Sequence, residues 1–467
     1  MAVPFDNATT LLTDLSDGIR QVYHEDFREM IPRFGRATNR FFKPSKRRID
    51  GDGINIQVMD RNLYGARTNT DINADFGTPR TFGADTYKVT LSETASANHM
   101  RRVELSLQVT WLDIKRKMNS KASAVNYVAE LTKQSMSNIA EHIAVRRHLP
   151  STALLGTVNG TPRGTDNRLT ASASAIAATG GASFPVDGGS FAAFQPNMVL
   201  DRYTGSTNDG QVIVLYTNAR DNSVHVYGVN SSFPGGSSTI SVSDIADNDD
   251  LYLSGEKDKN ILSFGHWFSD PSSGDSFFGK DRTDPTNRYL LPHASGPTSS
   301  TLFTRTHLDD LSNQMGYIDE DADSDGYIAL TTPELVTRYI AEIGQDTMIQ
   351  YPADDRRGKV LAGYGFDGNL YRHHTFGRYM LQGDALATPN QIRYLRVADW
   401  ETLYAPTEGG ENGWEWLPGQ QGMWYRMPSS TPGNGDTTTF RADGLMLMCD
   451  ICLAPRKQAK LINVTAT

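Results

Sequence analysis

The sequence has little cysteine, no long apolar run and no targeting pattern at its N-terminus. Two cysteines, Cys449 and Cys452, are too few for a disulfide scaffold, which is typical of a reducing compartment. No apolar run approaches the roughly 18 residues that would cross a bilayer, and the mean hydropathy is −0.46. The opening residues, MAVPFDNATTLL, do not follow the basic-then-apolar order of a signal peptide. We therefore expect synthesis and folding in a cytosol, away from membranes.

Positive charge is also scarce overall, but it is concentrated in one stretch. The net charge of −9 argues against nucleic-acid binding over the whole surface. Against a single acid, Glu29, the stretch from Arg28 to Arg48 carries these basic residues: Arg28, Arg33, Arg36, Arg40, Lys43, Lys46, Arg47 and Arg48. Prolines and large apolar residues interrupt any regular periodicity there, so we interpret it as an extended basic arm on an acidic body.

Two alternating strands with a polar tip follow the arm. Residues 54–58 and 87–92 alternate between apolar and polar side chains, and a third alternating run covers 103–110. The stretch between the first two, GARTNTDINADFGTPRTFG, has the composition of a mobile loop tip. A solitary hairpin is marginal in water, so we expect further copies of the same chain to complete it.

A long helix is predicted from Ser120, a suitable N-cap, to Leu149, directly before Pro150. Its length would be roughly 45 Å at about 1.5 Å per residue. One stripe of the helix, at steps of three and four, consists of Val125, Val128, Thr132, Met136, Ile139 and Ile143. Lys133, Glu141 and Arg147 take other faces. The stripe needs a partner, and we expect other copies of the chain to supply it.

The rest of the chain predicts about two to four subdomains, because 467 residues exceed one ordinary core. Residues 156–190 and 264–300 are loop-rich, and 194–252 form a small β insertion with strands at 212–216 and 224–229. Further helices are predicted at 302–315 and 333–343. Further strands are predicted at 327–330, 359–362, 392–397 and 445–453.

Asp321, Asp323 and Asp325, followed by Gly326, have the spacing that opens a calcium-binding loop. Alternate carboxylates before a glycine turn can surround a hard cation. The twelfth position of such a loop is Thr332 here instead of a bidentate Glu, and a strand follows where a helix is expected. We interpret the run as an acidic, solvated turn, and the sequence leaves cation binding by the three aspartates open.

Two more patterns match the residue spacing of a functional motif but lack the secondary structure that the motif requires. Gly363, Gly365 and Gly368 have dinucleotide-binding spacing, but neither a convincing helix nor a repeated βαβ pattern accompanies them, which predicts a turn. Cys449 and Cys452 lie in a strand-like run, where residues three apart face opposite sides. Packing explains them better than zinc or redox chemistry.

No catalytic constellation emerges. His373 and His374 point apart in an extended chain, and neither HExxH nor GxSxG occurs. One enzyme alternative, a secreted calcium-dependent carbohydrate-active enzyme, is suggested by the acidic run and by Trp400, Trp414, Trp416 and Trp424. It would need a signal peptide and a carboxylate pair in a cleft. We predict a protein that is not an enzyme, with no catalytic, cofactor-binding or metal-binding residues.

The order of elements resembles that of the major capsid proteins of tailed bacteriophages, which have the Hong Kong 97-type fold. The resemblance covers most of the chain and lies in the succession of elements. The passages that carry it are INIQVMDRNLY…YKVTLSE, RRVELSLQVTWLDIKRKMNSKASAVNYVAELTKQSMSNIAEHIAVRRHL, GYIALTTPELVTRYIAEI with KVLAGYGF, and LMLMCDICLAPRKQAKLINV.

The resemblance implies an α+β chain with the following division: N-terminal arm 1–53; extended-loop β-hairpin 54–98; peripheral domain 99–190 with the spine helix 120–149; β-rich insertion 191–262; loop-rich segment and helix 263–325; axial domain 326–435; C-terminal peripheral-domain strand 436–467. The insertion is not part of the minimal fold. The founding type of the family carries a long N-terminal scaffolding segment, whereas the arm here begins almost at Met1. This difference implies a separate scaffolding protein or none.

The function implied is self-assembly into hexamers and pentamers of an icosahedral head that encloses double-stranded DNA in the virion, after assembly in the host bacterial cytoplasm. The hairpin would lie over an adjacent subunit and the arm would reach another. The arm would screen DNA phosphates or clamp a neighbouring copy, because Phe34, Phe41 and Phe42 are awkward in free solvent. A portal and a decoration protein would be further partners. The alternative within the virion is a tail or decoration component.

Overall fold

The structure is a computed structural model of the whole chain. It describes residues 41–47, 49, 53–58, 86–91, 100–110, 121–159, 163–164, 181–187, 193–218, 223–229, 245–271, 277–318, 327–346, 370–373, 377–405, 415–417, 425–428 and 436–466. Most of the expected arm, the hairpin tip and the strand expected at 359–362 lie outside these residues. Among the described helices, none combines the length and the apolar character needed to cross a bilayer.

A sheet built around one long strand forms the first part of the fold. Strand β21 (Asp436–Cys452) pairs antiparallel with β4 (Arg101–Thr110), from Thr439 opposite Thr110 to Met448 opposite Arg101. Its other partners are β18 (Trp400–Tyr404), β19 (Glu415–Trp416) and β20 (Tyr425–Pro428). Residues 440–448 alternate between buried and half-buried, which is the period expected of a strand with one covered face.

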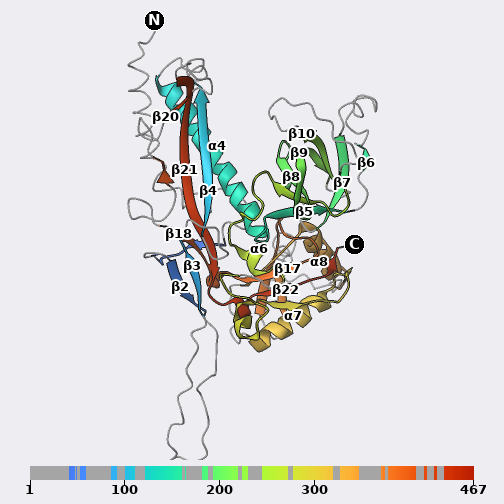
Figure 1. The fold of residues 1–467 in the computed structure, drawn as a ribbon. Helices are drawn as coiled ribbons and strands as arrows, with labels where there is room; N and C mark the ends of the chain where they lie inside the picture. Colours follow the sequence, from blue (N-terminus) through green and yellow to red (C-terminus); the bar gives the residue numbers. More distant parts are fainter. Residues whose placement is uncertain are drawn as a thin grey trace, which may run out of the picture.

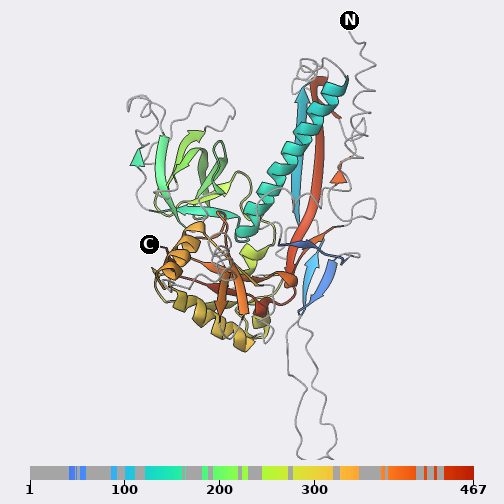
Figure 2. The same ribbon diagram turned by 180° about the vertical axis from the view of Figure 1, so that it is seen from behind.

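Helix α4 (Lys121–His148) lies along β4 and β21, and together they extend away from the compact sheets (Figures 1 and 2). We call these three elements the spar. The helix predicted at 120–149 is confirmed. Ile139 and Ile143 of its apolar stripe are buried in their own chain, so this half of the stripe does not need another copy, contrary to the sequence-based expectation.

The hairpin is also completed at its base by its own chain. Strands β2 (Gly53–Gln57) and β3 (Thr86–Thr90) pair antiparallel. Ile56 and Val89 are fully buried in a core that includes Trp267 and Trp400. The expectation that only other copies bury the hairpin is therefore wrong for its base, while the tip lies outside the described residues.

The inserted β region is a small closed barrel that is larger than expected. Its strand order is β10-β9-β8-β11-β5-β7, and β7 also pairs with β10 to close the ring. The strands are β5 (Leu154–Val158), β7 (Gly181–Asp187), β8 (Val199–Thr204), β9 (Thr207–Asn218), β10 (Ser223–Val229) and β11 (Asp250–Leu253), and β6 (Arg163–Gly164) pairs with β7. Residues 156–190 were expected to be loop, but they supply two barrel strands. Among the described strands, closure therefore gives each of the six ring strands a partner on both sides.

The remaining sheet mixes parallel and antiparallel strands in the order β12-β22-β17-β14-β16-β15. These strands are β12 (His293–Ser295), β14 (Tyr327–Thr331), β15 (Leu370–His373), β16 (Gly377–Gly383), β17 (Ile392–Arg396) and β22 (Ala459–Leu461). Helices α7 (Arg305–Ile318) and α8 (Pro333–Asp346) pack on it through Leu308, Leu311 and Leu335. A further short pair joins β13 (Thr301–Leu302) to β23 (Val464–Thr465).

The sheets do not follow the boundary expected at 435/436. Strand β18 lies before that point and pairs with β21, whereas β22 lies after it and pairs with β17. Leu330 and Leu395 of the mixed sheet lie in the same core as Trp267 and Trp400. Between β17 and β22 the chain therefore passes from the mixed sheet to the spar sheet and back, and one central core joins the two sheets.

Candidate functional site

The cysteines singled out in the sequence are packing residues of the central core. Cys449 and Cys452 are both free and fully buried in β21. Burial raises the pKa of each thiol well above its ordinary value, and Asp450 and Asp399 act in the same direction. Neither side chain is therefore a reactive thiolate at neutral pH.

Of the other sequence patterns, the acidic run 321–326, the glycines at 363–368, and His374 lie outside the described residues, and His373 ends β15. Within the described part of the chain, no group of three or more His, Cys, Asp or Glu residues could hold a metal ion. Trp400 and Trp416 are 2% and 6% exposed. They are thus core residues and offer no surface on which a sugar could stack.

The end of α4 meets β21 at a buried ion pair. Arg147 Nε lies 2.8 Å from Asp450 Oδ2 and Arg147 Nη2 lies 3.1 Å from Oδ1. The two side chains are 1% and 0% exposed. Asp450 also accepts hydrogen bonds from Ser263 Oγ (2.5 Å) and Thr402 Oγ1 (2.6 Å). Because each carboxylate oxygen has more than one donor, the buried charge is compensated.

The described part of the arm covers this ion pair. The Arg147 guanidinium lies 4.2 Å from the centre of the Phe42 ring, which is 3% exposed and stacks on Phe264 at 5.7 Å. Strand β1 (Lys43–Pro44) runs parallel to β18, and Ser45 Oγ donates to Glu401 at 2.6 Å. Phe42 was expected to be buried by a neighbouring copy, but it packs on its own chain.

The C-terminal end of α4 is closed by two residues of the segment that follows the barrel. The last carbonyls of a helix lack partners within it. Asn260 Nδ2 lies 3.0, 3.0 and 2.8 Å from the carbonyl oxygens of Arg146, Leu149 and Pro150. A Cβ at Gly265 would lie 2.3 Å from Leu149 O, so only glycine permits this close approach. These contacts fix the direction of the spar relative to the core.

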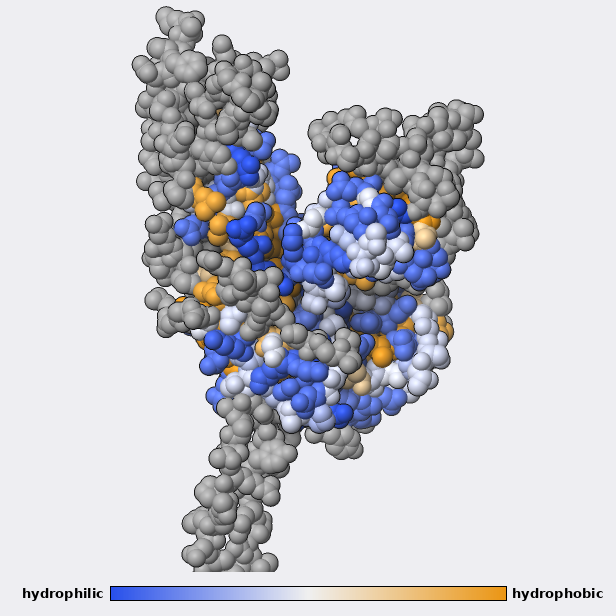
Figure 3. All heavy atoms as spheres, in the orientation of Figure 1, coloured by the Kyte–Doolittle hydropathy of each residue, from blue (hydrophilic) through white to orange (hydrophobic). Residues whose placement is uncertain are grey.

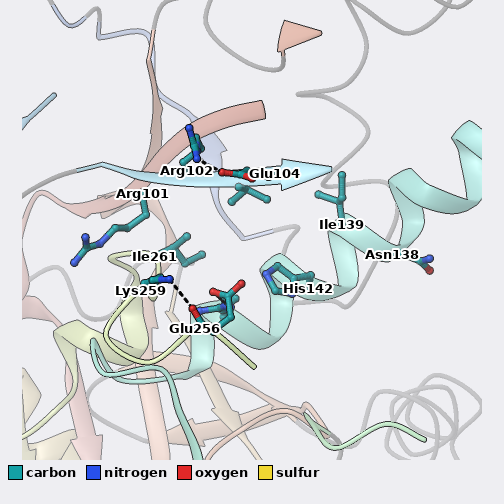
Figure 4. A pocket seen from close by; sticks show the side chains of 12 residues that line it. Arg101, Arg102, Glu104, Asn138, Ile139, His142, Glu256, Lys259 and Ile261 are labelled. Atoms are coloured by element: carbon teal, nitrogen blue, oxygen red, sulfur yellow. Dashed lines mark hydrogen bonds and ion pairs between the residues drawn. The ribbon is translucent and has the colours of Figure 1, made fainter. Parts of the chain in front are cut away.

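A cleft of about 670 Å³ lies between α4, the start of β4 and residues 255–261 (Figure 4). Arg101 and Arg102 reach it from β4, His142 and Arg146 from α4, and Lys259 from the segment after β11. A second cavity of about 330 Å³ shares Asn138, His142 and Arg146 with it and continues around the helix. In Figure 3, the notch between the spar and the barrel is bordered by hydrophilic residues.

Three histidines near the end of the spar have lowered pKa values. Burial lowers the pKa of His142 to about 4, and the adjacent Arg146 contributes. Burial lowers the pKa of His266 to about 3, with contributions from Arg282 and Arg101. The pKa of His148 is also lowered by burial, although Asp384, 3.5 Å away, opposes the shift. These imidazoles are therefore neutral at pH 7.

Sequence reasoning missed the residues that make this junction. Arg147 was placed on a face other than the apolar stripe and was given no partner. It is buried, and its partner Asp450 is 303 positions away. The basic last turn, Arg146-Arg147-His148, was a visible signal. That signal is equally typical of simple compensation of the helix dipole, so it did not identify a buried pair.

No family model matches the chain, and no curated protein matches it. Among solved structures, the capsid of cyanophage A-1(L) is similar with a TM-score of 0.44 and 9% identity, over 91% of this chain and 90% of that chain. The procapsid of satellite phage P4 is similar with a TM-score of 0.40 and 6% identity, over 95% and 91%. The capsid of cyanophage Pam1 is similar with a TM-score of 0.35 and 9% identity, over 90% and 86%. All three are phage capsid structures.

Proposed function

We propose that this chain is the major capsid protein of a tailed bacteriophage, a non-enzymatic protein that assembles into a shell. The observation that carries the proposal is the spar and its place in the chain. A hairpin, a strand of 10 residues and a helix of 28 residues follow one another, and a strand of 17 residues returns alongside them. This is the succession on which the family resemblance depends.

The spar offers a surface that its own chain leaves open. On β4, Val103 and Leu107 are buried, whereas the alternate residues Arg102, Glu104 and Gln108 are exposed. A long element with one polar face open to solvent supports side-by-side packing of many copies, in which modest contacts sum to a stable lattice.

The finer features of the proposal concern how copies meet. The subunits form hexamers and pentamers of an icosahedral head, with the hairpin tip over an adjacent subunit. The basic residues of the arm before Phe41 lie against packaged double-stranded DNA or a neighbouring copy. Scaffolding, portal and decoration proteins are further partners, and assembly takes place in the cytoplasm of the host bacterium. The extra barrel braces or decorates the shell.

The second candidate is another virion component, such as a tail or decoration protein, which would share the β content without needing the hairpin, strand and helix in this order. Negative-stain electron microscopy of the expressed, purified chain separates the two. Closed shells or their hexameric and pentameric pieces are expected. Tubes, or single particles the size of one chain at every concentration, would overturn the proposal.

A further inference from the structure

The cleft beside α4 has a lining with more positive than negative side chains. The positive ones are Arg101, Arg102, Arg146 and Lys259, and the carboxylates are Glu104 and Glu256. The two carboxylates are already used, because Arg102 pairs with Glu104 and Arg146 pairs with Glu256. On a chain with a net charge of −9, this is an unusual local excess.

The two remaining cations have only backbone acceptors for hydrogen bonds among the described residues. Arg101 Nη2 lies 3.5 Å from the carbonyl of Asp258, and Lys259 Nζ donates to that of Gly255 at 2.7 Å. A carbonyl satisfies a donor but does not neutralise its charge. The carboxylate of Asp258 offsets part of the charge on Arg101 from outside the lining. The cleft therefore still favours a negatively charged occupant.

Arg146 provides an independent indication of a missing acceptor. It is 4% exposed, and its Nη1 has no hydrogen-bond partner within the described part of the chain. A buried N–H without an acceptor costs free energy. Arg146 lines the cleft, so an occupant with carboxylates would place acceptors beside this guanidinium.

The volume of the cleft argues for a short segment. About 670 Å³ suits a few side chains and is typical of pockets for small ligands. A DNA duplex, whose major groove alone is about 12 Å wide, is too large to enter such a space.

The chain itself contains a matching acidic segment. Between α7, which ends at Ile318, and β14, which begins at Tyr327, the sequence reads DEDADSDG. Its carboxylates are Asp319, Glu320, Asp321, Asp323 and Asp325. Since the proposed function gathers many copies, such a segment would be present at high local concentration wherever copies meet.

The fold favours a neighbouring copy as the donor of this segment. Leu308 and Leu311 of α7 pack on one side of the mixed sheet. Leu330 and Leu395 of the same sheet pack in the core with Phe264, which lies against the end of α4. The mixed sheet thus stands between α7 and the end of α4 (Figures 1 and 2).

We propose that the cationic cleft of one copy binds the acidic segment 319–325 of a second copy, and so forms a charge-matched contact between subunits. This inference rests on the proposed assembly function. It assigns to the acidic run a role other than cation binding.

The inference is tested by reversing the charge of the cleft, of the acidic segment, and of both in one combined variant. The cleft variant is Arg102→Glu with Lys259→Glu, both at exposed positions, and the segment variant is Asp321→Lys with Asp323→Lys. The matched control reverses two exposed arginines elsewhere, Arg288→Glu with Arg456→Glu. The measurement is the fraction of protein in particles by sedimentation velocity, over a series of protein concentrations.

The cleft variant and the segment variant are each expected to raise the concentration needed for assembly by about tenfold or more, which corresponds to about 1.4 kcal/mol. The combined variant should return near wild type, and the control should match wild type. Wild-type assembly by either separate variant would overturn the inference. If the cleft variant loses assembly and the combined variant does not regain it, the cleft binds nucleic acid or another protein. This result would also overturn the inference.

Two further results separate this inference from the assembly proposal. The first is a combined variant that regains the melting temperature of the unassembled chain but not its assembly, to the same extent at every protein concentration. In that case the segment binds the cleft of its own chain, and the proposed contact between copies is wrong. If the wild-type chain forms no particles, the proposed function itself fails, and the inference falls with it.

Discussion

Arg147 in the last turn of α4 and Asp450 in β21 form a two-point hydrogen-bonded ion pair that is sealed from solvent on every side. The pair joins the spar to the central core at the point where β18 and the arm also arrive. Because the partner hydroxyls of Ser263 and Thr402 complete the carboxylate shell, the pair favours one angle between the spar and the compact sheets.

Replacing Arg147 with Met should lower the free energy of unfolding by about 3–5 kcal/mol, because it leaves the charge of Asp450 buried and unmatched. The double variant Arg147→Met with Asp450→Asn should be less destabilised than Arg147→Met alone. Urea unfolding of the unassembled chain measures both. The exposed Arg288→Met serves as the control, and equal stability of Arg147→Met and Arg288→Met would contradict a structural role for the pair.

Replacing Asn260 with Ala should lower the free energy of unfolding by about 1–3 kcal/mol, since it removes the side-chain donor to the carbonyls of Arg146, Leu149 and Pro150. The Arg146 and Pro150 carbonyls keep a backbone N–H donor, so the main cost falls on the Leu149 carbonyl. Asn260→Asp should cost more, because a carboxylate would face those carbonyl oxygens. Hydrogen exchange of the amides at 145–149 gives a local measurement, with faster exchange expected in both variants. Asn208→Ala, at an exposed position of β9, is the control, and unchanged exchange in Asn260→Ala would refute the capping role.

Lowering the pH should destabilise the fold through His266. Its folded pKa of about 3 lies below the ordinary 6.5, so the unfolded chain takes up a proton in this interval while the folded chain does not. Stability is therefore complete above about pH 6.5 and falls by up to about 1.4 kcal/mol per pH unit below it. The cations facing the ring are Arg282 and Arg101, and both lower the pKa of His266.

The variant His266→Phe keeps a ring stacked on Phe277, which lies 4.6 Å away, and removes the titration. Between pH 7 and pH 5 it should lose about 2 kcal/mol less stability than the wild type. Urea midpoints at both pH values measure the difference, and parallel losses in the two proteins would count against the assignment.

Shortening the hairpin between Gly65 and Gly83 to a tight turn should leave the single chain folded but prevent a stable lattice. The base survives because Ile56 and Val89 are buried in the central core. Circular dichroism melting reports the fold, and electron microscopy reports assembly. A deletion within 167–178 is the control. Normal shells from the hairpin variant would show that the hairpin tip is not needed for assembly.

Local periodicity was enough to predict the separate elements. The alternation at 103–110 and the three-and-four spacing up to Ile143 led to β4 and α4 nearly at their observed bounds. Helix α8 begins at Pro333, as its start signal predicts.

Pairings between distant segments could not be predicted in the same way. Nothing local to Arg147 indicates Asp450, and nothing in the small-residue composition of 181–187 indicates a barrel strand that pairs with both β5 and β10. The burial of Phe42 follows from the same limit, because the aromatic cluster it joins is assembled from Phe264 and Trp400, far along the chain. The sequence therefore indicated correctly that the hairpin and helix need partners, but it assigned too many of those partners to other copies.

The most direct test of the account is sedimentation velocity of the purified full-length chain over a wide range of protein concentration and ionic strength. The account predicts a boundary of free subunits and a much faster boundary of uniform shell-sized particles, whose share grows with concentration. A single slow boundary of one chain under all conditions, with one cooperative melting transition, would contradict it.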